Sequence, residues 1–434
     1  MQELEIEALH DYFLQTSGIC TDTRKIDAQS LFIALKGENF DGNLFVEQAI
    51  QAGAKYAISS DANFANNTNI FYVNDTLVAL QNLANYHRKQ FDIPVIAITG
   101  SNGKTTTKEL FNVVLSKKYQ TLATIGNLNN HIGVPLTLLR LNSTHEVAII
   151  EMGANHQGEI ELLSGIAEPT IGLITNIGKA HLEGFGGIEG VIKGKTELYQ
   201  FLQAHEGLIV FNADNEILQE KAKHTKTLTY GFKANADCQG QIIHDEPFLS
   251  LNYTYQNSAK TKVDSNLIGL YNAENILGAI CVAKYLHVDD ALIAEAIAGY
   301  APDNSRSQII KKGSNTIILD AYNANPSSMK AALDNFSKMQ AQNKMVILGD
   351  MFELGDSSAQ EHEAIVKEAL KGNYQECIFV GPKFSAFVQT VKSKSFIQVA
   401  DCLSYLKENA ISNSHILIKG SRGMKMEQLL ALFS

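Results

Sequence analysis

Several features of common protein classes are missing from this sequence. Its 434 residues contain no apolar run near the roughly 20 residues that a membrane-spanning helix requires, so we expect no membrane insertion. The first residues, MQELEIEALHDYF, are acidic and amphipathic, which does not fit a secretory signal peptide. Lys and Arg are not clustered and the formal net charge is −10, which argues against nucleic-acid binding. These absences favour a soluble cytoplasmic protein.

Cysteine is scarce and scattered. None of the cysteines forms a C-x-x-C pair, and their number is odd; they are Cys20, Cys238, Cys281, Cys377 and Cys402. The pattern therefore indicates neither a zinc knuckle nor a disulfide framework.

Three regions with different patterns of apolar residues and glycines predict three α/β domains, in line with the length of the chain. Residues 1–90 combine short apolar runs with glycine-rich breaks and predict a small α/β domain. Residues 91–300 alternate apolar strands with helices, which predicts a parallel sheet covered on both faces. Within them, residues 225–265 read as antiparallel strands. Residues 301–434 repeat the strand–helix alternation and predict a second doubly wound, Rossmann-like sheet.

A phosphate-binding loop is predicted at residues 99–107, where TGSNGKTTT follows a strand and opens a helix over residues 108–115. Glycines let backbone N–H groups turn towards phosphate oxygens, and the helix N-terminus adds its positive end. Lys104 is placed to reach terminal phosphates, and the Thr105 hydroxyl to bind Mg²⁺. Ile98 stands where the longer G-x-x-x-x-G-K-[ST] pattern has its first glycine. The alternative is a glycine turn that only starts a helix, but strand, glycines, lysine and hydroxyls coincide here.

Polar residues follow two of the next predicted strands. Glu151 ends the apolar strand 147–150, where a carboxylate beside the phosphate loop is placed to hold Mg²⁺. His181 lies in a glycine-rich segment after the strand 171–176. Each residue has a plain alternative, because acids at strand ends and histidines in loops are common.

Lys195 is the most informative single residue. Apolar residues from Ile188 to Leu202 recur at spacings of three and four and predict one buried helix face. Lys195 falls in the middle of that face, whereas Lys193 and Glu197 do not. A buried lysine is expected to be neutral, paired or chemically modified. The alternative is a side chain whose ammonium group reaches solvent along the helix.

Together these motifs resemble the Mur ligase family over essentially the whole chain. The similar segments occur in the expected order at residues 99–106, 127–137, 151–153, 180–186, 271–275, 320–326, 349–355 and 419–422. Two of them, Asn-Ala-Asn-Pro and Gly-Asp-Met-x-Glu-Leu-Gly, resemble the branch that adds a D-alanyl-D-alanine dipeptide.

The resemblance implies an ATP-dependent amide-bond-forming ligase with two Mg²⁺ sites. It would join D-Ala-D-Ala to UDP-N-acetylmuramoyl-tripeptide through an acyl phosphate. The product would be the UDP-muramoyl-pentapeptide precursor of peptidoglycan. Lys195 matches a carbamylated lysine of the family, formed when the neutral amine adds CO₂. The implied catalytic residues are Lys104, Glu151, His181 and Lys195, and the implied metal ligands are Thr105, Glu151, His181 and modified Lys195.

The same resemblance implies the ligand contacts, and we expect a monomer. The implied ATP-binding residues are Gly100, Ser101, Asn102, Gly103, Lys104, Thr105, Thr106, Asn275, Arg306 and Asp320. The implied substrate-binding residues are Thr23, Arg24, Lys36, Gly37 and Asp41 for the uridine nucleotide, Asn127, Asn129 and Asn130 for the peptide, and Asn323, Asn325 and Pro326 for the dipeptide. One departure is Tyr271, where related ligases often have histidine.

Two rival functions are weighed against this one. The first is a sister ligase that adds a different amino acid, or a folylpolyglutamate-type synthetase. The second is a phosphate-loop NTPase switch, which hydrolyses ATP without an amine substrate and leaves the first-domain segment 37–42 unexplained.

Overall fold

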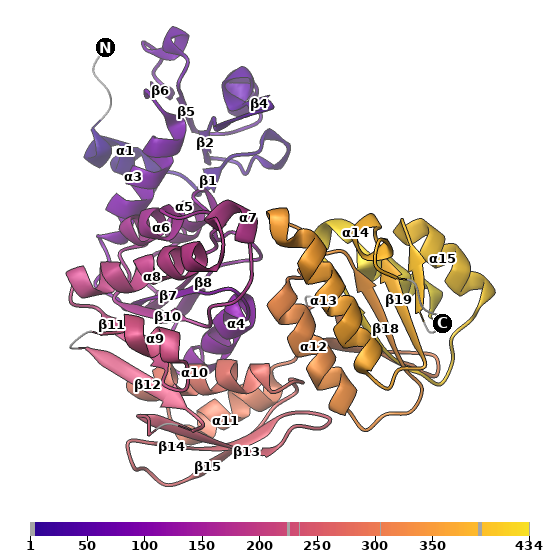
Figure 1. The fold of residues 1–434 in the computed structure, drawn as a ribbon. Coiled ribbons are helices and arrows are strands. Elements are labelled where there is room, and N and C mark those ends of the chain that lie inside the picture. The colour runs from indigo at the N-terminus through magenta and orange to yellow at the C-terminus, as the bar shows by residue number, and fades with distance from the viewer. Residues whose placement is uncertain (1–4, 224–225, 234, 304, 389–392, 434) are drawn as a thin grey trace.

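A computed structural model shows three α/β domains, which confirms the predicted fold class (Figure 1). The N-terminal domain, in indigo, stands on the central domain, and the C-terminal domain, in orange and yellow, lies beside it. The residues described are 5–223, 226–233, 235–303, 305–388 and 393–433. The first four residues of the predicted acidic N-terminus lie outside them. No helix in these ranges is long and apolar enough to cross a membrane.

The N-terminal domain is built on a parallel four-stranded sheet in the order β1-β2-β5-β6. Its strands are β1 (Ile19–Cys20), β2 (Leu31–Ile33), β5 (Tyr56–Ser59) and β6 (Ile70–Tyr72), with a hairpin of β3 (Lys36–Gly37) and β4 (Phe40–Asp41). Its helices are α1 (Ile6–Leu14), α2 (Val46–Gln51) and α3 (Thr76–Arg88). The domain is anchored through α3, because Arg88 donates hydrogen bonds to the carbonyls of Ala167 and Glu168 in the central domain.

The central domain contains a nine-stranded sheet in the order β15-β14-β13-β12-β11-β10-β7-β9-β8. Its strands are β7 (Val95–Thr99), β8 (Thr121–Ala123), β9 (Val147–Glu151), β10 (Ile171–Ile174), β11 (Leu208–Asn212), β12 (Thr227–Gly231), β13 (Cys238–His244), β14 (Ser250–Tyr255) and β15 (Thr261–Asp264). Only β13, β14 and β15 pair antiparallel. The antiparallel prediction is wrong for β12, which pairs parallel with β11 because a helical crossover returns the chain in the same direction.

The helices of the central domain cover both faces of this sheet. They are α4 (Lys104–Leu115), α5 (Gly133–Leu138), α6 (Glu159–Ala167), α7 (Leu182–Phe185), α8 (Ile188–Ala204), α9 (Glu216–Lys221), α10 (Tyr271–Tyr285) and α11 (Asp290–Gly299). Helix α4 starts one turn earlier than predicted, directly at Lys104. Strand β7 lies between β10 and β9, so the segments after these three strands meet at one edge of the sheet.

The buried face of α8 differs from the predicted one most clearly at Ile188 and Glu197. Ile188, at the first turn, is 39% exposed. Glu197 is buried, although its position in the sequence places it off the apolar face. Its carboxylate accepts hydrogen bonds from the backbone N–H groups of Gly158 and Glu161 at the start of α6. Glu197 is therefore buried because it satisfies free donors of a neighbouring helix. Lys195 is buried as predicted.

The C-terminal domain contains a six-stranded sheet in the order β16-β17-β21-β18-β19-β20. Its strands are β16 (Gln308–Lys312), β17 (Asn315–Asp320), β18 (Lys344–Gly349), β19 (Glu376–Val380), β20 (Ser393–Phe396) and β21 (His415–Lys419). Its helices are α12 (Pro326–Lys338), α13 (Ser358–Lys371), α14 (Pro382–Ser385) and α15 (Val399–Glu408). The sequence did not predict β16 and β20, because both are edge strands with polar residues.

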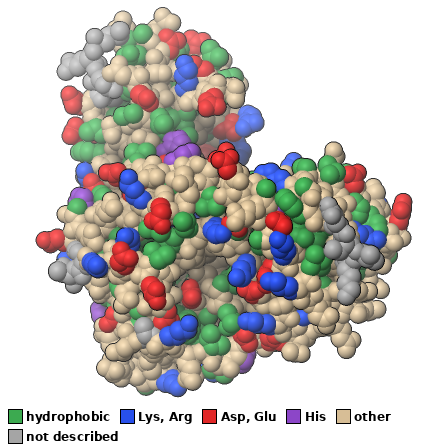
Figure 2. All heavy atoms as spheres, in the orientation of Figure 1, with side chains coloured by type: hydrophobic (Ala, Val, Ile, Leu, Met, Phe, Trp, Pro, Cys, Tyr) green, Lys and Arg blue, Asp and Glu red, His purple; other side chains and the backbone are tan. Residues whose placement is uncertain are grey.

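Charged side chains of both signs are interspersed over the molecular face in Figure 2. No continuous basic patch is visible among the described residues of that face.

Candidate active site

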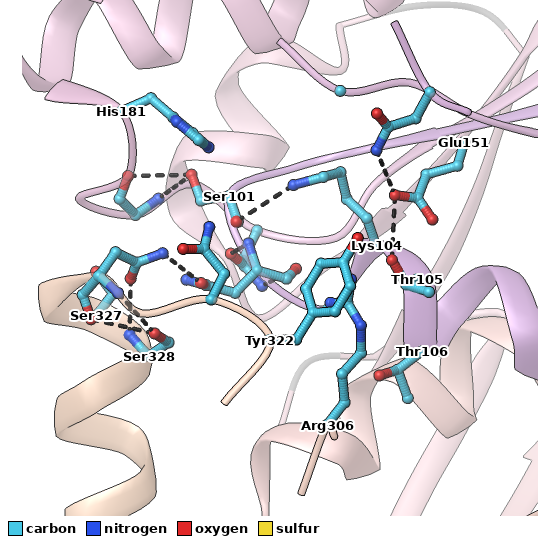
Figure 3. A pocket seen from close by; sticks show the side chains of 18 of the residues that line it. Ser101, Lys104, Thr105, Thr106, Glu151, His181, Arg306, Tyr322, Ser327 and Ser328 are labelled. Atoms are coloured by element: carbon cyan, nitrogen blue, oxygen red, sulfur yellow. Dashed lines mark hydrogen bonds between the residues drawn. The ribbon is translucent and has the colours of Figure 1, made fainter. Parts of the chain in front are cut away.

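A cavity of about 750 Å³ lies between the central and C-terminal domains (Figure 3). It gathers most of the predicted site residues from segments far apart in the sequence. Those that line it are Ser101, Asn102, Gly103, Lys104, Thr105, Thr106, Asn127, Asn129, Asn130, Glu151, His181, Asn275, Arg306, Asp320, Asn323 and Asn325. The predicted residues Gly100, Lys195 and Pro326 do not line it.

The phosphate loop follows a path that requires glycine at two positions. Gly100 and Gly103 have φ angles of +140° and +80°. A Cβ at Gly100 would lie 2.0 Å from the Thr175 hydroxyl oxygen, so the loop passes directly over the end of β10. Thr175 also donates a hydrogen bond of 2.6 Å to the carbonyl of Asn102. The loop is thereby held against β10 while its residues 101–106 face the cavity.

Lys104 folds over this loop. Its ammonium group donates a hydrogen bond of 2.7 Å to the carbonyl of Gly100. Burial lowers the pKa of Lys104 to about 8, Glu151 partly opposes that change and Arg306 adds to it. A lysine in this position can neutralise phosphate oxygens that enter the loop.

Glu151 carries an unpaired carboxylate oxygen beside the loop. The residue is only 1% exposed. Oε1 accepts hydrogen bonds from Thr105 at 3.1 Å and from Asn129 at 2.8 Å. Oε2 is buried and has no hydrogen-bond partner within the described part of the chain. A buried carboxylate oxygen needs a donor or a cation, and a hard divalent cation prefers carboxylate and hydroxyl ligands.

The protein side chains near Glu151 fit a metal ion only with help from other ligands. Across the described ranges, no three His, Cys, Asp or Glu side chains form a group able to hold a metal. Phosphate oxygens or a modified lysine would have to complete the coordination.

His181 reaches the cavity from the loop before α7. It has a left-handed backbone with φ of +52°. Its Nδ1 atom lies in contact with the carboxylate of Glu353 from the C-terminal domain. This contact lowers the pKa of the Glu353 carboxyl group. Glu353 belongs to the motif at residues 349–355 but was not among the predicted site residues.

Lys195 lies one layer behind the cavity wall. The residue is 1% exposed, so the alternative in which its ammonium group reaches solvent is wrong. Its Nζ atom donates a hydrogen bond of 3.1 Å to the carbonyl of Ala154, a residue that lines the cavity. Burial lowers the pKa of Lys195 well below the usual value, and the nearby Lys104 lowers it further. The structure thus favours the neutral, nucleophilic amine.

Asn275 packs against the phosphate loop from α10. A Cβ at Gly103 would lie 2.8 Å from its Oδ1 atom. Asn275 accepts a hydrogen bond of 3.2 Å from Thr107 and donates one of 2.9 Å to Asn272. Tyr271, one turn earlier, also lines the cavity and is hydrogen-bonded through its hydroxyl to Ser307.

Arg306 and Asp320 bring opposite charges to the cavity from the C-terminal domain. The guanidinium carbon of Arg306 lies 3.7 Å from the centre of the Tyr322 ring. Its buried Nε atom has no hydrogen-bond partner among the residues that the structure describes. Asp320 forms an ion pair with the buried Lys419 and accepts a hydrogen bond from the backbone of Ser307.

The C-terminal domain also touches the phosphate loop directly. The Asn325 side chain donates a hydrogen bond of 2.7 Å to the side chain of Asn102. Ser327 accepts a hydrogen bond of 2.9 Å from the backbone of Lys179. Asn325 additionally caps α12, with Ser328 completing a capping box.

Several cavity residues were missed by the sequence prediction. They include Tyr322, Ser327, Ser328 and Lys419. Tyr322 and Lys419 lie within motifs that carry the family resemblance. Ser327 and Ser328 follow an Asn-Pro pair, and the capping pattern at the start of a helix is a signal that could have identified them.

The predicted uridine-nucleotide residues lie outside the cavity. Thr23 and Arg24 follow β1, and Lys36, Gly37 and Asp41 follow β2, so both groups are at the carboxyl edge of the N-terminal sheet. Arg24 forms two hydrogen bonds of 2.8 Å with the Asp22 carboxylate.

Comparison with known proteins covers nearly the whole chain. Three family models match it in order: "Mur ligase family, catalytic domain" at residues 15–97, "Mur ligase middle domain" at 98–283, and "Mur ligase, glutamate ligase domain" at 305–422.

Curated relatives and solved structures give the same result. UDP-N-acetylmuramoyl-tripeptide–D-alanyl-D-alanine ligase of Bacillus subtilis is 37% identical, over 95% of this chain and 92% of the relative. The Escherichia coli ligase of the same name is 35% identical, over 95% and 92%. A crystal structure of MurF from Acinetobacter baumannii has a TM-score of 0.88 at 32% identity, covering 99% and 98% of the two chains. MurF from Thermotoga maritima in complex with ADP has a TM-score of 0.86 at 26% identity, covering 97% of each. The chain therefore belongs to the Mur ligase family.

Proposed function

We propose that this chain is an ATP-dependent ligase that joins D-Ala-D-Ala to UDP-N-acetylmuramoyl-tripeptide. The products are ADP, phosphate and the UDP-muramoyl-pentapeptide used to build peptidoglycan. The observation that carries the proposal is the shared cavity, where the phosphate loop, Glu151 and His181 meet residues of the C-terminal domain. The identity of the substrates is inferred from similarity to MurF proteins over nearly the full chain.

The chemistry requires activation of a carboxylate, because a carboxylate does not react with an amine at neutral pH. A carboxylate oxygen of the tripeptide attacks the γ-phosphorus of ATP, and ADP leaves. The amine of D-Ala-D-Ala then attacks the acyl carbon of the resulting acyl phosphate. Phosphate leaves with the former carboxylate oxygen, and the new amide nitrogen loses a proton. Lys104 binds and neutralises the transferred phosphoryl group during the first step.

Two Mg²⁺ ions would neutralise phosphate charge when bound. Thr105 and Glu151 would hold the ion that accompanies ATP. Glu151, His181 and Lys195 would hold the other, with Lys195 converted to a carbamate by addition of CO₂ to its amine. The unpaired Oε2 of Glu151 and the buried amine of Lys195 support these assignments.

The remaining cavity residues would bind and orient the substrates. Asn275 would contact adenine, Asp320 the ribose and Arg306 the phosphates of ATP, together with residues 100–106. The peptide and dipeptide would lie near residues 127–130 and 323–326. Contact between the C-terminal domain and the phosphate loop supports this arrangement, and excluding water there protects the acyl phosphate.

An amide-formation assay with ATP, UDP-muramoyl tripeptide and D-Ala-D-Ala tests the proposal. We expect phosphate release that depends on the dipeptide, and movement of carboxylate ¹⁸O into phosphate. Release with a single amino acid instead would favour a sister ligase, and turnover without any amine would favour an NTPase switch. The proposal includes a cytoplasmic monomer, for which light scattering should give a mass near 47.6 kDa.

A further inference from the structure

The motif at residues 349–355 makes a contact between two domains that has no role in the reaction proposed above. Glu353 contacts Nδ1 of His181, and its carbonyl accepts a hydrogen bond of 3.4 Å from the backbone of Glu183. Glu353 and His181 have φ angles of +61° and +52°, a left-handed conformation that non-glycine residues rarely adopt. Such strain persists only where the surrounding structure holds it, and it is frequent at functional sites.

The loop that carries Glu353 is anchored at the three preceding residues. The Asp350 carboxylate accepts hydrogen bonds from the first backbone N–H groups of α14, at 3.0 and 2.9 Å. The backbone N–H of Met351 donates to Nε2 of His362 at 3.0 Å. The backbone N–H of Phe352 donates to the Ser421 hydroxyl at 3.1 Å. The position of Glu353 is therefore set by the framework of the C-terminal domain.

His181 has two ring nitrogens with different surroundings. Nδ1 is buried and in contact with the Glu353 carboxylate, and among the described residues it has no hydrogen bond of regular geometry. The ring lines the cavity, and Figure 3 shows it extending towards the phosphate loop. A carboxylate beside Nδ1 favours the tautomer that carries its proton on that nitrogen, and Nε2 is then the nitrogen that can bind a metal.

We propose that Glu353 is a positioning residue that fixes the tautomer and ring orientation of His181 when the C-terminal domain docks. Docking would then complete the metal site as well as close the cavity. The inference rests on the proposed function, because it takes His181 as a metal ligand.

A separate cross-domain ion pair provides a matched control. Lys179, two residues before His181, pairs with Glu361 of α13. It joins the same two domains without touching the histidine. The side chain of Glu353 is 54% exposed, so loss of its charge is expected to change stability little. The two pairs should therefore differ in their effect on metal binding.

The test compares Glu353→Ala, Glu353→Gln and Glu361→Gln in the full chain with ADP and bicarbonate. Free Mn²⁺ is measured by electron paramagnetic resonance, and folding by circular dichroism. We expect Glu353→Ala to weaken Mn²⁺ binding by about 10- to 100-fold, the usual effect of losing the partner of a ligating histidine. Glu353→Gln keeps an oxygen that accepts the Nδ1 proton and should restore most of the affinity. Glu361→Gln should bind Mn²⁺ like the wild type.

Two results would overturn the inference. One is Glu353→Ala, or Glu353→Gln if the alanine variant does not fold, binding Mn²⁺ as tightly as the wild type or more tightly, which would show that Glu353 does not support metal binding. The other is a further loss from Glu353→Ala in a His181→Ala background, which would show action independent of the histidine. Wild-type protein without dipeptide-dependent amide formation would instead refute the proposed function. The two failures are therefore distinguishable.

Discussion

Alanine at Gly103 should damage the nucleotide loop in a way that alanine at Gly158 does not. Both glycines directly precede a helix of the central domain, α4 and α6, with φ angles of +80° and +83°. A Cβ at Gly103 would lie 2.8 Å from Oδ1 of Asn275, whereas nothing lies within 4 Å at Gly158. The two variants therefore share the same backbone strain and differ in one close contact.

The magnitude follows from that difference. Left-handed backbone costs an alanine about 1–2 kcal/mol, which is the whole effect expected for Gly158→Ala. In Gly103→Ala the Asn275 side chain must also move, and it holds hydrogen bonds with Thr107 and Asn272. Each of these contributes about 0.5–1.5 kcal/mol, so the total loss should be about 2–5 kcal/mol.

Urea unfolding followed by circular dichroism measures this loss, since the sequence has no tryptophan for fluorescence. Calorimetry with ADP measures the affinity of the loop for a nucleotide. We expect Gly103→Ala to bind ADP at least about tenfold more weakly, or about 1.4 kcal/mol, and Gly158→Ala to bind it like the wild type. Equal stability and equal ADP affinity in the two variants would refute the assignment of Gly103 to a tightly packed nucleotide loop.

Three other sites test a modified lysine, pH dependence and helix capping. Lys195→Ala should lose amide formation and regain part of it with added acetate; full activity would contradict the metal role. Burial lowers the pKa of both His10 and His87, so the folded protein binds protons at these residues less readily than the unfolded chain. Urea-unfolding free energy should therefore fall as pH drops below about 6.5, less steeply in His10→Phe. Asn325→Ala should cost about 1 kcal/mol by uncapping α12. The shorter side chain in Asn325→Ser still caps α12 but cannot reach Asn102. If both variants bind ADP more weakly than the wild type, the cause is therefore loss of the hydrogen bond to Asn102.

Local sequence patterns determined much of the architecture. Apolar runs that alternate with helices predicted the three α/β domains, because strands buried on both faces have few polar residues. The strand, glycine loop and helix at residues 95–115 were also predictable, since strand, glycines and lysine act within one short segment. The burial of Lys195 followed from helical spacing, which depends only on the backbone of its own helix.

Tertiary structure decided the features that depend on neighbours from distant segments. Glu197 lies off the apolar face of α8 in sequence, yet it is buried because α6 offers two free N–H donors beside it. Strand β12 took its direction from a crossover helix, not from its own residues. The contact between His181 and Glu353 joins two domains, and no periodicity in either segment encodes it. The sequence shows which face of a helix or strand will be buried, because that depends on the order of apolar and polar residues along it. Which distant segment packs against that face is decided only when the chain folds.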